Sequence, residues 1–152
     1  MTKLKSLLIA AIPLIGGIIS GLLTMGNMDY YDTLTKPPLS PPGILFPIAW
    51  SILYILMGIS SLIIAKSSSP DKQNALTVFY TQLIFNLLWP LIFFNLNELL
   101  FAFVWLVFLW ILVFANIVYF AKISKPAAWL LVPYLLWITF AGYLNLSVYL
   151  LN

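Results

Sequence analysis

Five long apolar stretches alternate with short polar connections along the chain. They cover residues 7–25, 44–65, 75–94, 99–121 and 126–151, and none contains Asp, Glu, Lys or Arg. A helix that crosses a bilayer needs about 20 apolar residues. Lipid offers the backbone no hydrogen-bond partners, and the stretches lack the period of two of barrel strands, so we expect helices. The pattern predicts an all-α integral membrane protein, a bundle of five transmembrane helices in a single domain over residues 1–152.

The composition supports this interpretation and excludes several kinds of chemistry. Hydrophobic residues make up 63% of the chain and charged residues only 7%, whereas a soluble domain is about 25% charged. The chain has neither Cys nor His, which excludes disulfides, the usual zinc sites and catalysis by thiolate or imidazole. We therefore expect no metal site and no required cofactor. A net charge of +3 is too small to indicate a nucleic-acid partner.

The charges at the ends of the stretches predict an orientation. If successive stretches cross in opposite directions, one side of the membrane holds the charges Lys3, Lys5, Lys66, Asp71, Lys72, Lys122 and Lys125. The opposite side holds Asp29, Asp32, Lys36 and Glu98. By the positive-inside rule, the N-terminus is cytoplasmic and the C-terminus lies outside. A lysine-flanked first stretch suits a bacterial cell membrane, with a mitochondrial membrane as the alternative. Residues 3–25 have an alternative interpretation as a cleaved signal peptide. We favour a transmembrane span, because no convincing cleavage site follows Thr24.

The longest connection, residues 29–43, reads DYYDTLTKPPLSPPG and is stiffer than the others. Its prolines are Pro37, Pro38, Pro41 and Pro42. Proline fixes φ and biases the preceding residue towards extended geometry. We expect one or two helical turns over residues 29–35 and then a structured lid on the outer face, with Ser40 capping the second helix and Pro41 in its first turn. A plain rigid connector is the alternative.

Aromatic and amide side chains recur at helical spacing inside three of the stretches. They are Trp50, Tyr54 and Met57; Gln82, Asn86, Trp89 and Phe93; and Tyr134, Trp137, Ala141 and Asn145. Residues three and four apart share one face of a helix, and amides are costly in lipid, so these faces should point inward. Two interpretations stay open, an aromatic pocket for a large, flat, mostly apolar ligand, or polar contacts that join the helices. Separately, Gly17-x-x-x-Gly21 permits close helix approach, within the bundle or between protomers.

Motifs along the chain from about residue 30 to its end carry a family resemblance. They are YDTLTKP at 31–37, SPPG at 40–43 and W..LY at 50–54, then QL..N..W...FF at 82–94 and AWLLVPYLLWITFAGYLN at 128–145. Together and in this order they resemble the signature of the translocator protein family (TspO/MBR, also called peripheral-type benzodiazepine receptors). Three positions depart from the family pattern: Tyr30 and Leu39, where the family often has Trp, and Pro90, where a small polar residue is usual.

The resemblance implies a five-helix bundle, often a homodimer, with a pocket beneath the first loop. Family members bind porphyrins such as protoporphyrin IX, and some bind cholesterol or benzodiazepine drugs. By motif match it implies that Tyr31, Trp50, Asn86, Trp137 and Ala141 belong to the pocket and that the proline loop is the lid. Some bacterial members are reported to promote light-dependent porphyrin breakdown, in which the catalytic residues here would be Trp50 and Trp137.

We therefore expect a membrane protein that binds porphyrin or a related flat apolar molecule for sensing, scavenging or transport. The predicted ligand-binding residues are Tyr31, Trp50, Tyr54, Gln82, Asn86, Trp89, Phe93, Tyr134, Trp137, Ala141 and Asn145. The predicted lid residues are Lys36, Pro37, Pro38, Pro41 and Pro42, with Lys36 close enough to the mouth to pair with a propionate. The alternatives are light-dependent porphyrin degradation and passive transport of a sterol or another lipid-like molecule. Expected partners are the small molecule, membrane lipid and a second copy of the chain.

Overall fold

The computed structural model describes all 152 residues, and its regular elements are helices only. The long helices are α1 (Lys3–Thr24), α3 (Leu45–Ala65), α4 (Lys72–Pro90), α5 (Leu99–Ala121) and α7 (Val132–Leu151). The short elements are the 3₁₀ helix η1 (Met25–Asn27), α2 (Asp29–Thr33), the π-helix η2 (Leu91–Asn95) and α6 (Lys125–Trp129). Five segments are long and apolar enough to cross a membrane. The predicted fold class and its five spans are confirmed.

Two prolines explain where the third and fifth spans depart from a plain α-helix. Pro90 ends α4, and the following five residues form the π-helix η2. Pro133 lies in the first turn of α7, and α6 ends at Trp129, four residues earlier. Proline has no N–H, so the carbonyl of Trp129 has no i+4 donor and the helix breaks there. The fifth span therefore consists of α6 and α7.

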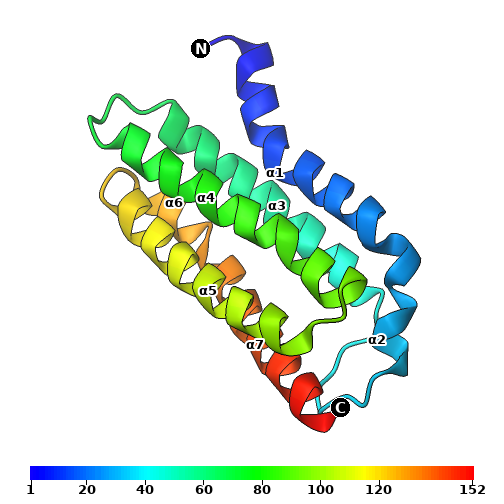
Figure 1. Ribbon diagram of the computed structural model, residues 1–152. Helices are drawn as coiled ribbons and strands as arrows, with labels where there is room; N and C mark the ends of the chain where they lie inside the picture. Colours follow the sequence, from blue (N-terminus) through cyan, green and yellow to red (C-terminus); the bar gives the residue numbers. More distant parts are fainter.

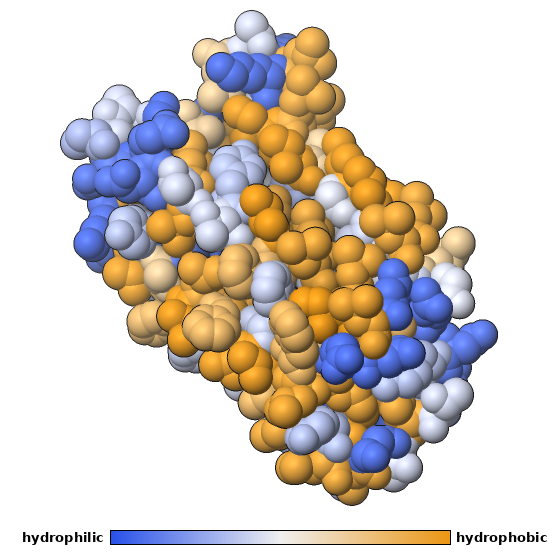
Figure 2. All heavy atoms as spheres, viewed as in Figure 1, coloured by the Kyte–Doolittle hydropathy of each residue, from blue (hydrophilic) through white to orange (hydrophobic).

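The helices form an antiparallel bundle in which α1 lies at one edge (Figure 1). Helix α1 packs chiefly on α3 and also on α4, while α5 packs on α4, α6 and α7. The bundle core contains large, fully buried side chains such as Phe79, Phe120 and Tyr134. Apolar side chains cover most of the visible surface, and hydrophilic ones gather mainly towards its ends (Figure 2). This is the surface expected of a protein dissolved in lipid.

Two glycines bring α1 and α3 into close contact. A Cβ on Gly58 would collide with the backbone carbonyl of Ala10, and a Cβ on Gly17 would collide with the ring of Tyr54. At Gly58 only glycine permits this approach without a shift of a helix, while at Gly17 the group that would have to move is a side chain. Gly17 therefore acts within the bundle, one of the two roles expected for the Gly17-x-x-x-Gly21 motif. Gly21 lies beyond this contact, and a Cβ there would meet no atom within 4 Å.

The connection from α1 to α3 folds over one end of the bundle, beside the C-terminus (Figure 1). Helix α2 supplies the short helix predicted over residues 29–35. The prediction that Ser40 caps the second span with Pro41 in its first turn was wrong, because α3 begins only at Leu45, and its N-cap residue makes no side-chain hydrogen bond. The Ser40 hydroxyl instead donates to the carbonyl of Pro37 at 2.7 Å, so it is engaged inside the loop.

Hydrogen bonds tie this connection, residues 29–43 and hereafter the lid, to helix α7. The Tyr143 hydroxyl donates to the carbonyl of Pro38 at 2.9 Å. The side-chain amide of Asn152 accepts from the Thr35 N–H at 3.0 Å and donates to the Thr35 carbonyl at 2.9 Å. Stiff proline segments joined to α7 in this way form a cover over one end of the bundle.

Candidate ligand-binding cavity

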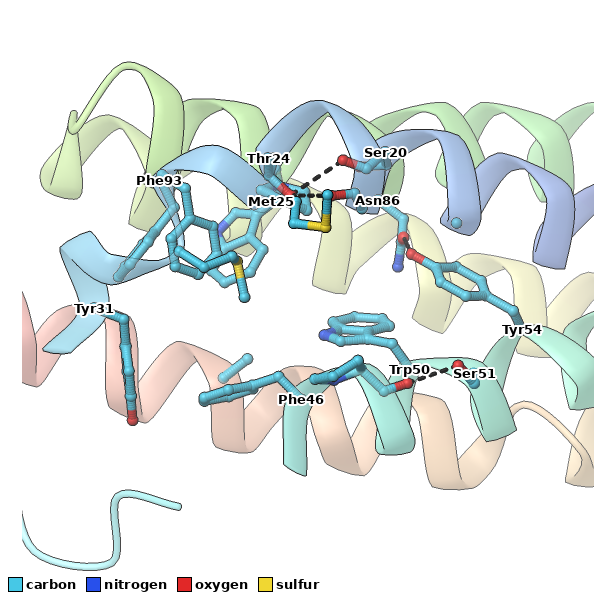
Figure 3. Close-up of a pocket in the computed structure, with 18 of the residues that line it drawn as sticks. Ser20, Thr24, Met25, Tyr31, Phe46, Trp50, Ser51, Tyr54, Asn86 and Phe93 are labelled. Carbon is cyan, nitrogen blue, oxygen red and sulfur yellow. Dashed lines mark hydrogen bonds between the residues drawn. The ribbon is translucent and has the colours of Figure 1, made fainter. Parts of the chain in front are cut away.

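A cavity of about 450 Å³ lies inside the bundle, between α1, α3, the end of α4 with η2, and α7. Tyr31 from α2 lies at one end of it, Tyr54 and Asn86 lie at the other, and Trp50 lies between them (Figure 3). Most of the lining side chains are apolar or aromatic. Volumes of about 300–1,000 Å³ with such walls are typical of small-molecule sites.

Aromatic rings build the middle of the cavity wall. The rings of Trp50 and Tyr54 stack with centroids 5.7 Å apart and an interplanar angle of 26°. They belong to one face of α3 because they are four residues apart. The edges of Trp137 and Tyr134 on α7 pack against Trp50, with centroids 6.4 and 6.2 Å away. These neighbours fix the Trp50 indole as a rigid surface on which a flat ligand can stack.

A chain of hydrogen bonds closes the deep end of the cavity. The Tyr54 hydroxyl donates to Oδ1 of Asn86 at 2.6 Å, and Nδ2 of Asn86 donates to the Tyr134 hydroxyl at 2.8 Å. That hydroxyl in turn donates to Oε1 of Gln82 at 2.7 Å. All four side chains are buried. Residues on α3, α4 and α7 are thereby joined, and the polar groups next to the cavity are already paired.

A second amide joins helices along the side of the cavity. The indole N–H of Trp89 donates to Oδ1 of Asn145 at 3.1 Å, and Nδ2 of Asn145 donates to the carbonyl of Leu99 at 2.8 Å. Asn145 also lines the cavity, as Asn86 does. The two interpretations of the buried amides are thus compatible, because the same side chains hold helices together and contribute to the wall.

The lid contributes Tyr31 to the cavity wall. Its ring packs edge-on against Phe46 at 5.2 Å, and its hydroxyl donates to the carbonyl of Pro41 at 3.2 Å. Burial raises the pKa of the Tyr31 phenol above its ordinary value of 10.0; the hydrogen bond with Ser40 lowers it and the Asp32 carboxylate raises it. The phenol is therefore a neutral donor at physiological pH and holds the lid closed on itself.

The structure brings most of the predicted ligand-binding residues together. Those on the cavity wall are Tyr31, Trp50, Tyr54, Asn86, Trp89, Phe93, Ala141 and Asn145. Gln82, Tyr134 and Trp137 are not part of the wall, since the first two lie in the core behind Asn86 and the third packs behind Trp50 and Phe46. Contact between a ligand and any of the predicted ligand-binding residues stays a prediction. Buried polar atoms without a partner include Nε2 of Gln82 and Nε1 of Trp137.

The predicted lid residues cover the cavity from a distance instead of lining it. None of Lys36, Pro37, Pro38, Pro41 and Pro42 is part of the wall. The Lys36 ammonium lies 4.8 Å from the centroid of the Tyr31 ring and donates to the carbonyl of Leu34 at 3.2 Å. It therefore engages the lid itself, and its pairing with a propionate stays a prediction.

Helix α1 contributes a side of the cavity that the sequence did not single out. Its lining residues include Leu14, Gly17, Ile18, Ser20, Gly21, Leu22 and Thr24. The α1 stretch lacks the aromatic and amide pattern of the other walls, so the small residues were the only available signal. Phe46 was missed as well, although it lies one turn before Trp50 on α3 and therefore on the same face.

The fold and the cavity together define the class. This is a helical membrane protein with five spans, a ligand-sized, aromatic cavity between four of them, and a structured loop over one end of the bundle. The sequence profile of the TspO/MBR family matches residues 9–151. The chain belongs to the TspO/MBR family, as its motifs suggested, and is an integral membrane protein.

Individual relatives agree over most of their length. The "Tryptophan-rich protein TspO" of Chlorobaculum tepidum is 42% identical over 125 residues, which span 81% of this chain and 79% of that protein. The "Tryptophan-rich sensory protein" of Cereibacter sphaeroides is 36% identical over 124 residues, 82% and 77% of the two chains. The "Translocator protein" of Bos taurus is 35% identical over 138 residues, 88% and 82% of the two chains.

Proposed function

We propose that the protein binds a large, flat, mostly apolar molecule in this cavity and that the ligand is a porphyrin such as protoporphyrin IX. The observation that carries the proposal is the Trp50 indole, held rigidly beside a cavity of about 450 Å³ by Tyr54, Tyr134 and Trp137. Aromatic walls favour a planar π-system, and few unpaired polar groups nearby favour an apolar one.

The wall chemistry fits a metal-free tetrapyrrole in particular. Such a ring needs no axial ligand, and the chain offers neither the Cys nor the His that commonly ligate haem iron. The polar groups that line the cavity, such as Ser20, Ser51 and Asn86, are uncharged. Each already donates within the protein, but the hydroxyl oxygens can still accept and the second N–H of Asn86 can still donate to a pyrrole nitrogen or a carboxyl group, without the cost of burying a further charge.

We propose that this binding serves tetrapyrrole sensing, scavenging or transport. The relatives support the proposal through their printed names, one a sensory protein and another a translocator. The only charged side chains of the spans are Lys3, Lys5, Lys72 and Lys125, all within a span's first turn. Ion-coupled carriers usually need such a group within the membrane, so passive transfer of a ligand fits the chain better than driven transport.

Light-dependent breakdown of the bound porphyrin is a second candidate, favoured by one specific contact. The indole of Trp50 borders the cavity and its ring meets the edge of Trp137 at 6.4 Å. A photoexcited porphyrin against Trp50 would thus face two oxidisable indoles in succession. The chemistry in this case would belong largely to the excited ligand and oxygen, because the cavity wall holds no acid–base pair.

A titration with protoporphyrin IX tests both candidates. The purified protein is titrated in the dark while tryptophan fluorescence and porphyrin absorption are followed together, and the complex is then illuminated. Saturable quenching with stable absorption bands supports binding alone. Saturable quenching followed by loss of the bands, faster than for free porphyrin, supports photochemical turnover. Absence of saturable quenching contradicts the proposed function.

A further inference from the structure

Specific contacts close most of the seams between the elements around the cavity. Between α1 and α4, the Ser20 hydroxyl donates to the carbonyl of Leu87 at 2.8 Å. Nearer the lid, the Asn95 side chain on η2 donates to the carbonyl of Leu23 at 3.1 Å. Between α4 and α7, the Trp89 indole reaches Asn145. Each of these bonds crosses a gap through which a ligand would otherwise pass.

Aromatic packing and the lid close two further sides. Trp137 on α7 meets both Trp50 and Phe46 on α3, with ring centroids 6.4 and 6.1 Å apart. The lid is held by the bond from Tyr143 to Pro38 and by the paired bonds of Asn152. The aqueous end of the cavity is thus covered by a tethered, proline-stiffened segment.

The seam between α1 and α3 is different, because the two helices are in contact at one end of it and not at the other. Gly58 meets the backbone of Ala10, and Gly17 meets the ring of Tyr54, so the two helices touch over this part of their length. One turn further towards the lid, a Cβ on Gly21 would meet no atom within 4 Å. The contact between the helices therefore ends just past Gly17 and Tyr54.

Side chains beyond that point belong both to the cavity wall and to the outer surface. Ile18 and Leu22 on α1 and Met25 at the start of η1 line the cavity, and they are 54%, 62% and 66% exposed. On α3, Pro47 and Ser51 line it and are exposed as well. In a bilayer this exposed surface faces lipid, since both helices are transmembrane spans. No hydrogen bond or aromatic contact joins the two rims between Gly21 and Ser51.

We infer that the gap between α1 and α3 is a lateral portal through which a membrane-dissolved ligand enters the cavity, with Gly21 at its edge. The identity of the ligand rests on the proposed function, and the portal adds the route by which that ligand reaches the cavity. The admitted molecules are apolar compounds that partition into the bilayer, because both rims are apolar apart from Ser51, whose hydroxyl is paired with the Pro47 carbonyl at 2.6 Å. The lid stays closed during entry.

Thiol labelling in membranes tests the portal without any porphyrin. The chain has no cysteine, so Ala141→Cys places a single thiol on the cavity wall, on α7. The rate at which an uncharged, lipid-soluble maleimide labels this thiol is measured for Ala141→Cys alone and for Ala141→Cys combined with each of three second substitutions. Gly21→Phe fills the free space at the portal edge. Gly26→Phe is the matched control, since Gly26 also has no atom within 4 Å of a Cβ but lies outside the wall. Tyr143→Phe releases one tether of the lid.

The portal predicts that Gly21→Phe slows labelling by about tenfold or more, as expected when an access route is blocked. It predicts that Gly26→Phe and Tyr143→Phe leave the rate within about twofold. An unchanged rate in Gly21→Phe, faster labelling in Tyr143→Phe, or no labelling of Ala141→Cys alone would each overturn the inference. Porphyrin binding is decided by the titration above, so failure of the portal and failure of the proposed function are separate results.

Discussion

The phenol of Tyr54 donates a 2.6 Å hydrogen bond to Oδ1 of Asn86 at the boundary between the cavity and the core. The same amide donates to Tyr134, which donates onward to Gln82. Because these side chains are buried, each polar group depends on its protein partner. The network therefore fixes both the position of Asn86 at the cavity wall and the packing of α3, α4 and α7.

Removal of the Tyr134 hydroxyl should destabilise the bundle more than removal of the Tyr54 hydroxyl. Tyr134→Phe breaks two hydrogen bonds, and we expect it to lower the free energy of unfolding by about 1–2 kcal/mol. Tyr54→Phe breaks one and should cost about half as much. Tyr149→Phe on the exposed part of α7 is the control. Denaturation in a single detergent gives the free energy of unfolding of all three variants. A Tyr134→Phe protein as stable as the control would show that these hydrogen bonds do not stabilise the bundle.

The two glycine contacts between α1 and α3 should be sensitive to a single methyl group. Gly58→Ala places that methyl against the Ala10 carbonyl, and a backbone atom cannot turn away. We expect a loss of about 1–3 kcal/mol, and a smaller loss for Gly17→Ala, whose neighbour is a side chain. Gly142→Ala is the matched control, because its nearest neighbour outside its own helix is at 3.9 Å. Equal thermal stability of Gly58→Ala and Gly142→Ala would show that the helices do not touch there.

The lid should respond to pH through Tyr31. Burial raises the pKa of this phenol above 10.0 in the folded protein, so its neutral form contributes stability that is fully present below pH 10. That contribution is lost as the pH rises through the raised pKa. We expect the stability advantage of the wild type over Tyr31→Phe to be constant below pH 10 and to shrink above it. Thermal unfolding of both proteins between pH 8 and pH 11.5 measures this difference, and an advantage that persists unchanged at the alkaline end would refute it.

The tryptophan pair should separate photochemistry from binding. We expect Trp50→Phe with Trp137→Phe to abolish light-driven change of bound protoporphyrin IX but largely to keep binding, because phenylalanine retains an aromatic surface. Binding is followed by the porphyrin absorption spectrum in the dark and turnover by its decay under light. Trp129→Phe is the control, since 70% of the Trp129 side chain is exposed and it lies outside the cavity. Undiminished breakdown in the double variant would rule out a catalytic role for these two indoles.

Hydropathy predicts the five spans well because lipid imposes both length and polarity on them. The finer features depend on contacts that no single segment encodes. The break before Pro133 follows from a missing N–H group, and a π-helix directly follows Pro90, yet proline alone does not say whether a helix bends, tightens or ends. The cap predicted at Ser40 was wrong because α3 begins only at Leu45, so the first N–H groups of the helix lie beyond the reach of the Ser40 hydroxyl.

Helical spacing identified one face of three helices but not the depth of each residue on that face. Asn86 and Gln82 are one turn apart on α4, and only Asn86 reaches the cavity, because Gln82 is covered by the core around Tyr134. The side of the cavity formed by α1 could not be recognised from the α1 sequence alone. The feature that distinguishes Gly21 is that no atom of another element lies within 4 Å of a Cβ placed there. Such gaps are properties of the assembled bundle.

The most direct test of the cavity as the binding site is the titration of Ala141→Phe with protoporphyrin IX. Ala141 is a small wall residue, so a phenyl ring there occupies the space that the ligand needs. Leu136→Phe on the exposed face of α7 is the matched control, since 65% of that side chain faces outward. We expect Ala141→Phe to weaken binding by about tenfold or more and Leu136→Phe to bind like the wild type. Wild-type affinity in Ala141→Phe would contradict it and would place the ligand elsewhere on the protein.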